Sequence, residues 1–310
     1  MTPKSETMVR QPSPATRLDA TAITILIAMC LCLAVGQVAM KVANQGISPV
    51  LQAGLRSVGG ALILALFARW RGIALFERNG ILWPAIACSF FFAAEFALLY
   101  PGLQATTVAH AIILLYTSPV VVAVGAHFLI PGDRLTGAKS AGLLLALAGV
   151  ASVVLGRDTS ATTGGPTLYG DLLCLAAALA WGALTLVIRT TRLATVPAER
   201  VTFLQLLISA PVLCALSWAL GEPGITNPTP LVLGSFGFTV IFVAGFVFTT
   251  TTWLFTRYPA SRVMAFLLLT PVFGVLASHM LLGEPLGSGV IAGLALVLAG
   301  LWLVNRPARR

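Results

Sequence analysis

The chain has 310 residues, of which 58% are hydrophobic and only 9% are charged. Soluble globular domains carry about 25% charged residues, so this composition excludes an ordinary water-soluble domain. The formal net charge is +9, but the basic residues are scattered through short connections between apolar runs. That distribution is typical of membrane topology signals and argues against nucleic-acid binding.

The apolar runs predict ten transmembrane helices, since a helix needs about 20 apolar residues to cross a hydrocarbon core of about 30 Å. We expect them at residues 20–42, 47–69, 80–101, 105–130, 137–156, 169–190, 200–220, 231–254, 259–282 and 286–304. Turn residues such as Pro101-Gly102 separate them. The expected fold class is therefore an all-α polytopic membrane protein, with short tails at 1–19 and 305–310.

The lysine and arginine residues predict the orientation. If the N-terminus is cytoplasmic, all but three of the 19 basic residues fall in cytoplasmic segments, and the exceptions are Lys41, Arg56 and Arg157. Cytoplasmic loops of membrane proteins are enriched in these residues. We therefore expect both termini in the cytoplasm and the chain in a bacterial inner (plasma) membrane.

The second half of the chain repeats the first. A shift of 152 residues superposes Pro119 on Pro271 and His127 on His279. We expect five-helix repeats at 20–156 and 169–304, joined by an outside linker at 157–168. An odd number of spans inserts the second repeat upside down, which is the arrangement that gives alternating access to a site near the membrane midplane.

Two prolines occupy matching positions inside the fourth and ninth predicted spans. Pro119 and Pro271 each remove a backbone donor and crowd the preceding turn. We expect each to kink its helix and to serve as a hinge, although a static kink that only shapes the bundle is the alternative.

These features resemble the drug/metabolite transporter superfamily, specifically its ten-helix EamA-type members. The resemblance covers residues ~20–304 and rests on Gly283-Glu284-Pro285-Leu286, Gly132-Asp133-Arg134-Leu135 and Trp181-Gly182. The first half departs from the pattern, with Val35-Gly36 where Trp-Gly is typical. Within the superfamily the chain is similar to YddG-like exporters of aromatic and other amphipathic amino acids. Four residues carry that narrower likeness, which alone implies export: Glu95, Tyr116, Trp181 and Trp253.

Glu95 is the leading candidate for a substrate-binding residue. It lies well inside the third span, where an acidic residue costs about 2.5–3.5 kcal/mol at the membrane centre. It can receive an amino group, carry a proton, or pair with Lys41 or Arg56. A structural ion pair is the alternative interpretation, and both basic side chains can also reach the interface by snorkelling.

The other candidate side chains supply polar and aromatic surface for a substrate. Gln37 and Lys41 share one helix face, aromatic rings can form an apolar wall or stack on a cation, and His110 can titrate near neutral pH. Packing within the bundle is the alternative role for Tyr116, Trp181 and Trp253, and a place in the aromatic belt at the outer boundary of the membrane is the alternative for Tyr100. The full set of predicted substrate-binding residues is Glu95, Tyr116, Trp181, Trp253, Gln37, Lys41, Tyr100 and His110.

The function expected from these features is secondary transport of small amphipathic metabolites, and amino acids, including aromatic ones, are the substrates we expect most. An exporter of cationic drugs or quaternary ammonium compounds is the alternative within the superfamily, and an integral-membrane enzyme is the alternative from another class. No cofactor or metal is expected, because the three histidines are far apart in sequence and the five cysteines lack metal-site spacing. The expected partners are the substrate and the lipid bilayer, and a monomer is the starting expectation.

Overall fold

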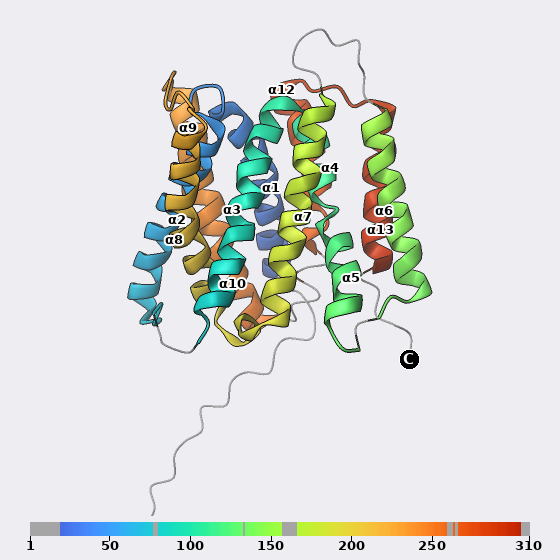
Figure 1. The fold of residues 1–310 in the computed structure, drawn as a ribbon. Helices are drawn as coiled ribbons and strands as arrows, with labels where there is room; N and C mark the ends of the chain where they lie inside the picture. The colour runs from blue at the N-terminus through green and yellow to red at the C-terminus, as the bar shows by residue number, and fades with distance from the viewer. Residues whose placement is uncertain are drawn as a thin grey trace, which may run out of the picture.

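The computed structural model of the protein describes residues 19–76, 80–132, 134–156, 166–258, 263 and 266–304. Helices run alongside one another between two ends of a bundle (Figure 1). We call the end at the top of Figure 1 the upper end, where residues 44–48, 106–107, 220–229 and 283–287 connect the helices. One isolated bridge there, between Ile47 and Ile225, is the β pairing found in the described residues.

The helices have the following bounds: α1 (Ala20–Ala43), α2 (Pro49–Arg71), α3 (Leu82–Ala105), α4 (Val108–Leu115), α5 (Ser118–Leu129), α6 (Gly137–Leu155), α7 (Leu168–Thr190), η1 (Arg192–Thr195), α8 (Ala198–Ala219), α9 (Pro230–Phe238), η2 (Thr239–Val247), α10 (Phe248–Arg257), α12 (Thr270–Leu282) and α13 (Ser288–Val304).

Eight helices in the described part of the chain are long and apolar enough to cross a membrane, when α4 and α5 count as one and α9 and η2 as another. Two further apolar helices, α12 and α13, are shorter than a full span. The first expected span, 20–42, and the sixth, 169–190, agree with α1 and α7 to within a residue. Much of the predicted linker 157–168, the predicted N-terminal tail except Asp19, and the whole predicted C-terminal tail lie outside the described residues.

The expected end of the third span at Pro101-Gly102 is wrong, because α3 continues to Ala105. Pro101 lies in the last turns of the helix, where its missing N–H removes only one bond of the helical ladder. The backbone N–H of Thr106 still bonds to the Gly102 carbonyl oxygen at 2.9 Å. A proline close to a helix end therefore does not stop this helix.

The predicted proline kinks are helix breaks rather than bends in continuous helices. The fourth span stops at Leu115 and restarts at Ser118, which places Pro119 in the first turn of α5. Pro271 has the same position in the first turn of α12. Proline is favoured there because the first turn of a helix needs no backbone donor. Whether either break acts as a hinge stays a prediction.

The eighth span contains a π-helical segment, η2, between α9 and α10. Its hydrogen bonds skip one residue more than those of an α-helix, so side chains rotate out of register along the segment. Such segments are rare and often occur at functional sites. No residue pattern in the sequence predicted it.

Glycines let α6 and α13 pack closely along one edge of the bundle (Figure 1). A Cβ atom on Gly149 would lie 2.8 Å from the carbonyl oxygen of Gly293, and one on Gly142 would lie 2.6 Å from that of Gly300. Backbones that approach this closely tolerate only glycine, as in small-residue contacts between membrane helices.

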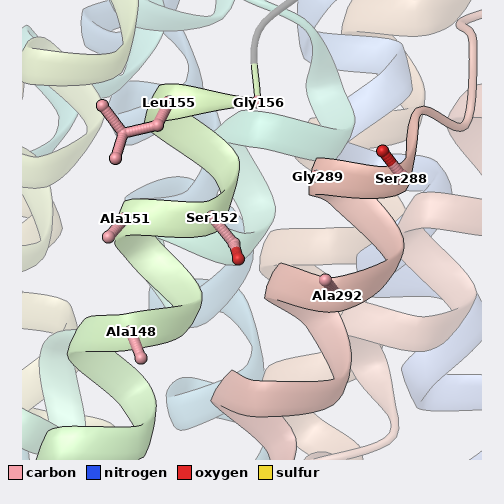
Figure 2. A pocket seen from close by; sticks show the side chains of 8 residues that line it. All are labelled: Ala148, Ala151, Ser152, Leu155, Gly156, Ser288, Gly289 and Ala292. Carbon is pink, nitrogen blue, oxygen red and sulfur yellow. The ribbon is translucent and has the colours of Figure 1, made fainter.

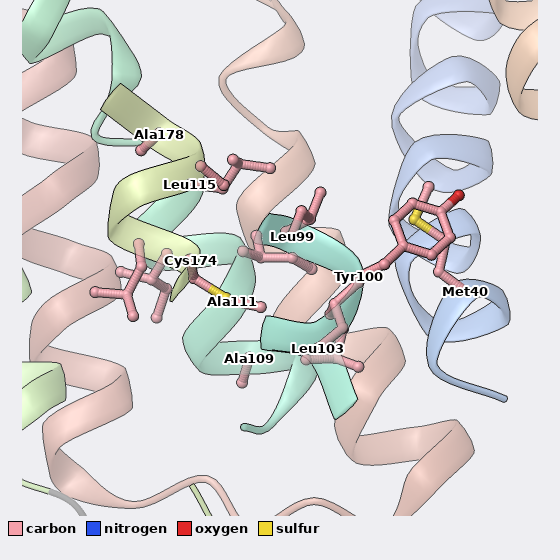
Figure 3. Packing of buried hydrophobic residues seen from close by; sticks show 14 of the residues in the cluster. Met40, Leu99, Tyr100, Leu103, Ala109, Ala111, Leu115, Cys174 and Ala178 are labelled. Carbon is pink, nitrogen blue, oxygen red and sulfur yellow. The ribbon is translucent and has the colours of Figure 1, made fainter. Parts of the chain in front are cut away.

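The largest apolar core lies among α3, α4 and α7, with α1 beside them (Figure 3). Leu99, Leu103, Ala111 and Cys174 meet there, all almost fully buried. The ring of Tyr100 extends from α3 to lie beside Met40 of α1. This core determines how deeply the polar side chains on the same helices are buried.

Candidate functional site

Lys41 is held by an ion pair at the upper end of the bundle. Its Nζ atom lies 3.1 Å from Oε1 of Glu284 and donates to the backbone carbonyl of Thr106 at 2.5 Å. The Glu284 carboxylate also accepts the backbone N–H groups of Val108 at 2.9 Å and Ala109 at 3.2 Å. These belong to the first turn of α4, where the helix dipole favours negative charge.

His110 is held by a second buried pair next to the first. Its Nδ1 atom lies 3.1 and 3.3 Å from the two carboxylate oxygens of Asp171, and the Thr106 hydroxyl donates to the same carboxylate at 2.6 Å. The side chains of His110 and Asp171 are 4% and 0% exposed. We call Lys41, Thr106, His110, Asp171 and Glu284 the upper network.

The upper network changes the interpretation of two predicted substrate-binding residues. Lys41 and His110 both face carboxylates of the protein itself, and neither pairs with Glu95, which lies nearly three turns from the end of α3. Sequence reasoning missed Thr106, Asp171 and Glu284 as members. An acidic residue in the first turn of an otherwise apolar helix, such as Asp171 in α7, was the available signal.

A similar cap joins the ends of α8 and α2. The Glu222 carboxylate accepts the backbone N–H groups of Val50 at 3.1 Å and Leu51 at 3.0 Å, and the Ser217 hydroxyl donates to it at 2.6 Å. Glu222 and Glu284 both follow a glycine and precede a proline. Each therefore stabilises a first-half helix from a loop of the second half.

A different arrangement surrounds Arg56 on α2. The side chain is 8% exposed, and its guanidinium carbon lies 4.7 Å from the centroid of the Phe96 ring. Its Nε and Nη1 atoms are buried and have no hydrogen-bond partner in the described part of the chain. We call Arg56, Glu95, Phe96 and Tyr100 the Arg56 group.

Glu95 lies beside Arg56 without forming an ion pair with it. The residue is 6% exposed, and Arg56 is the charged group that acts on it electrostatically. Among the described residues, the ion pairs within 4.0 Å are Lys41–Glu284 and His110–Asp171. Of the two partners that the sequence suggested for Glu95, Arg56 is therefore the neighbouring charge and Lys41 is not.

Tyr100 is fully buried, not part of an aromatic belt at the membrane surface. Its ring meets that of Phe96 edge-on at 5.9 Å, and its hydroxyl has no hydrogen-bond partner among the described residues. The side-chain oxygen of Gln37 is likewise buried and unpaired there. Buried polar atoms without partners are uncommon in proteins, so each calls for an explanation.

Tyr116 and Trp181 form an aromatic pair at the break between α4 and α5. Their ring centroids are 6.2 Å apart at an interplanar angle of 85°, which is a favourable edge-to-face contact. Both rings pack against the core that includes Phe96 and Tyr100. The structure therefore brings three of the predicted residues, Tyr100, Tyr116 and Trp181, to one core, and Glu95 directly precedes Phe96 of that core on α3.

Trp253 lies in a separate cluster. Its ring packs near Leu26, Met29 and Leu254, with the Arg257 guanidinium carbon 4.7 Å from the ring centroid. The structure does not bring it to the Tyr116–Trp181 pair. Thr251, two residues before it, donates its hydroxyl to the Val247 carbonyl oxygen at 2.7 Å.

A groove of about 600 Å³ lies between α6 and α13 (Figure 2). Its lining is made of small and apolar residues: Ala148, Ala151, Ser152, Leu155, Gly156, Ser288, Gly289 and Ala292. None of these described lining residues is ionisable, so they offer no charged group to recognise a charged metabolite. Among the described residues there is also no cluster of three or more potential metal ligands.

A family model for EamA-like transporters matches residues 20–155 and 168–306. The chain belongs to the EamA-like transporter family. Because the model matches each half separately, the division of the chain into two related segments agrees with the repeat seen in the sequence. The expectation of an EamA-type protein is confirmed, and the chain is a multi-pass membrane transporter.

Relatives and a solved structure agree with this assignment. The chain is 26% identical over 273 residues to "Uncharacterized transporter YoaV" of Bacillus subtilis, covering 86% of this chain and 90% of that protein. It is 28% identical over 270 residues to "Uncharacterized transporter YvbV" of the same organism, covering 84% of each. A crystal structure with 22% identity superposes with a TM-score of 0.62, covering 91% of this chain and 94% of that chain, which supports the fold.

Proposed function

We propose that this EamA-family protein is a secondary transporter that exports small amphipathic metabolites, above all amino acids including aromatic ones. It has ten spans in two inverted five-helix repeats and works by alternating access. It lies in a bacterial inner membrane with both termini in the cytoplasm, so that the upper end faces outward.

The observation that carries the substrate class is the environment of Glu95. Its carboxylate is buried and has no ion-pair partner among the described residues, and the residue directly precedes Phe96 of the core against which Tyr116 and Trp181 pack. This combination suits a substrate with an amino group and an apolar side chain. Aromatic rings supply apolar contact area and can also stack on a cation. The two kinds of group together favour an amphipathic amine over a sugar or a simple ion.

Alternating access is supported by the matching breaks at Pro119 and Pro271. Discontinuous helices at corresponding positions of two repeats are the usual mark of a transporter's midplane site. At the upper end, Lys41–Glu284 and His110–Asp171 connect helices of the first half to segments of the second. Such contacts hold that end closed while substrate enters from the other side.

A cation exporter is the second candidate, and the Lys41–Glu284 pair favours it. A free lysine beside the site would repel a quaternary ammonium compound, but Glu284 neutralises Lys41. Glu95 and the aromatic pair then provide a negative charge and ring faces, which are the groups that bind such cations.

Flux measurements in proteoliposomes test the proposal. The panel contains phenylalanine, leucine, a sugar phosphate and a quaternary ammonium compound, each measured with and without an imposed proton gradient. Saturable flux of the amino acids supports the substrate class, and its response to the gradient distinguishes proton coupling from facilitated diffusion. Flux of the quaternary ammonium compound alone supports the second candidate. Flux of the sugar phosphate alone would contradict both.

A further inference from the structure

Three potentially cationic side chains lie near the outward halves of the first-repeat helices, and the structure separates them by their partners. Lys41 pairs with Glu284, and His110 pairs with Asp171. Arg56 has neither a salt bridge nor a hydrogen-bond partner for its Nε and Nη1 atoms in the described part of the chain. Only Arg56 among these three therefore keeps buried donors for another group.

The contact with Phe96 holds the guanidinium group but leaves its hydrogen-bonding edge unused. A guanidinium 4.7 Å above a ring centroid gains a cation–π interaction through its face. The Nε and Nη N–H groups lie in the plane of the group, where they form a fork that matches the two oxygens of a carboxylate. Leaving charged donors buried and unpaired is costly, so this edge is suited to an anionic ligand.

Charge balance selects the kind of anion. Arg56 contributes one positive charge, Glu95 contributes one negative charge when it is ionised, and the two side chains are not within the 4.0 Å of an ion pair. A ligand that carries both a carboxylate and an ammonium group can satisfy both. A phosphate dianion would meet one cation and be repelled by the neighbouring carboxylate.

Two further buried polar groups lie on helices of the first repeat. The Tyr100 hydroxyl, which interacts with Arg56, and the Gln37 side-chain oxygen on α1 both lack a hydrogen-bond partner among the described residues. A hydroxyl can donate to a carboxylate, and an amide oxygen can accept from an ammonium group. The Tyr100 hydroxyl is therefore a further potential partner for a carboxylate at Arg56, and Gln37 is a potential acceptor on a neighbouring part of the first repeat.

We propose that Arg56 binds the carboxylate of a zwitterionic substrate while Glu95 binds its ammonium group. The assignment rests on the proposed function and adds to it a residue that the sequence had left among the alternatives. Lys41, the other basic residue that the sequence suggested as a neighbour of Glu95, is already neutralised by the Glu284 carboxylate.

The test compares three ligands that differ only in their charged groups: phenylalanine, phenethylamine, which lacks the carboxylate, and 3-phenylpropionate, which lacks the amine. Flux and binding are measured in proteoliposomes for the wild type, Arg56→Gln and Arg56→Lys. We expect Arg56→Gln to weaken phenylalanine binding by roughly 10- to 100-fold, as expected for loss of hydrogen bonds to a charged group. Phenethylamine should be unaffected, and Arg56→Lys should give an intermediate loss because it keeps the charge without the fork.

Lys41→Met is the matched control. It removes a basic side chain from the upper network, so it should lower thermal stability without changing the ratio of phenylalanine to phenethylamine binding. Equal losses for both ligands in Arg56→Gln, or failure of both Arg56 variants to insert and fold, would assign Arg56 to the fold and overturn the inference. A wild-type protein that moves none of the three ligands would instead overturn the proposed function.

Discussion

The upper network and the Arg56 group place the same kinds of side chain in similar surroundings, yet they differ in how their polar atoms are partnered. Each combines a basic and an acidic side chain within an apolar helix bundle. In the upper network, Lys41 and Glu284 bond to each other and to backbone groups. In the Arg56 group, Nε and Nη1 of Arg56 and the Tyr100 hydroxyl have no partner among the described residues.

This difference separates groups that stabilise the fold from groups available to a ligand. A buried polar network with its partners in place makes one arrangement unique, whereas a partly satisfied one costs free energy. Unpaired buried groups are tolerated where they serve a function, such as binding a ligand, that offsets this loss of stability. We therefore expect substitutions in the upper network to change stability first, and substitutions in or beside the Arg56 group to change transport first.

The largest effect on stability is expected from Asp171→Ala. The change takes the acceptor from the Thr106 hydroxyl and from His110, both buried. Each buried group left unpaired costs about 1–3 kcal/mol, so we expect unfolding to become easier by about 3 kcal/mol. The measurement is the apparent melting temperature of the purified protein in detergent, which should fall by several degrees.

Thr190→Ala is the control for that variant. Its hydroxyl donates to the Leu186 carbonyl of its own helix, and the residue is exposed. Its loss should leave the melting temperature nearly unchanged. If Asp171→Ala kept the wild-type melting temperature but abolished transport, the division between the two regions would be wrong, and Asp171 would belong with the ligand-binding groups.

Glu95→Gln and Trp181→Ala should lower the free energy of unfolding less than Asp171→Ala does, but they should strongly reduce the flux of substrate. Neither side chain takes part in the upper network, so both variants should insert and fold. Loss of a charged partner or of half the aromatic pair should reduce transport by about tenfold or more, which corresponds to about 1.4 kcal/mol of binding. Initial rates of flux, normalised to the amount of folded protein, provide the measurement.

Two substitutions of the same chemical type serve as controls. Trp218→Ala removes a ring that is 84% exposed, and Glu199→Gln changes a half-buried carboxylate in the first turn of α8. Both should transport at the wild-type rate. Wild-type flux in both Glu95→Gln and Trp181→Ala at normal expression would remove these residues from the site and leave the fold assignment unchanged.

The sequence predicted the helices well, because helix length and hydropathy are local properties. A run such as 169–190 must be helical to satisfy its backbone in lipid, and α7 follows it closely. The predicted end of the third span is too early because the prediction treats Pro101 as a helix-ending residue. The effect of a proline on a helix depends on how near the helix end it lies, which the sequence does not show. The π-helical segment Thr239–Val247 has no compositional mark at all.

The polar contacts were less predictable because they join distant parts of the chain. Sequence reasoning identified Glu95 as an acidic residue that is costly to bury in the membrane. It did not show the neighbours of the side chain, and it left open whether Lys41 or Arg56 lies beside it. The partner of Lys41 lies 243 residues away in a loop, and that of His110 lies 61 residues away. Hydropathy shows that a polar residue needs a partner, but only packing shows which one it has.

The smallest effect is expected from Asp19, an exposed carboxylate at the start of α1. It accepts the Ala22 backbone N–H at 2.7 Å, and this bond, together with the Tyr258 hydroxyl, lowers the pKa of Asp19 below its ordinary value of 3.8. Because the pKa is lower in the folded protein, the stabilisation is present above the ordinary pKa and is lost as the pH falls through the lowered one.

Asp19→Asn tests whether burial is what makes the upper network stabilising. Asparagine also caps helix N-termini, so the variant should match the wild type near neutral pH except for a slight loss. On acidification, that difference should disappear as Asp19 becomes protonated in the wild type. Melting temperatures of both proteins across the acid range measure it. Asp19→Asn could instead lower the melting temperature as much as Asp171→Ala does. In that case, exposed polar contacts at the helix ends would stabilise the bundle as much as the buried upper network does.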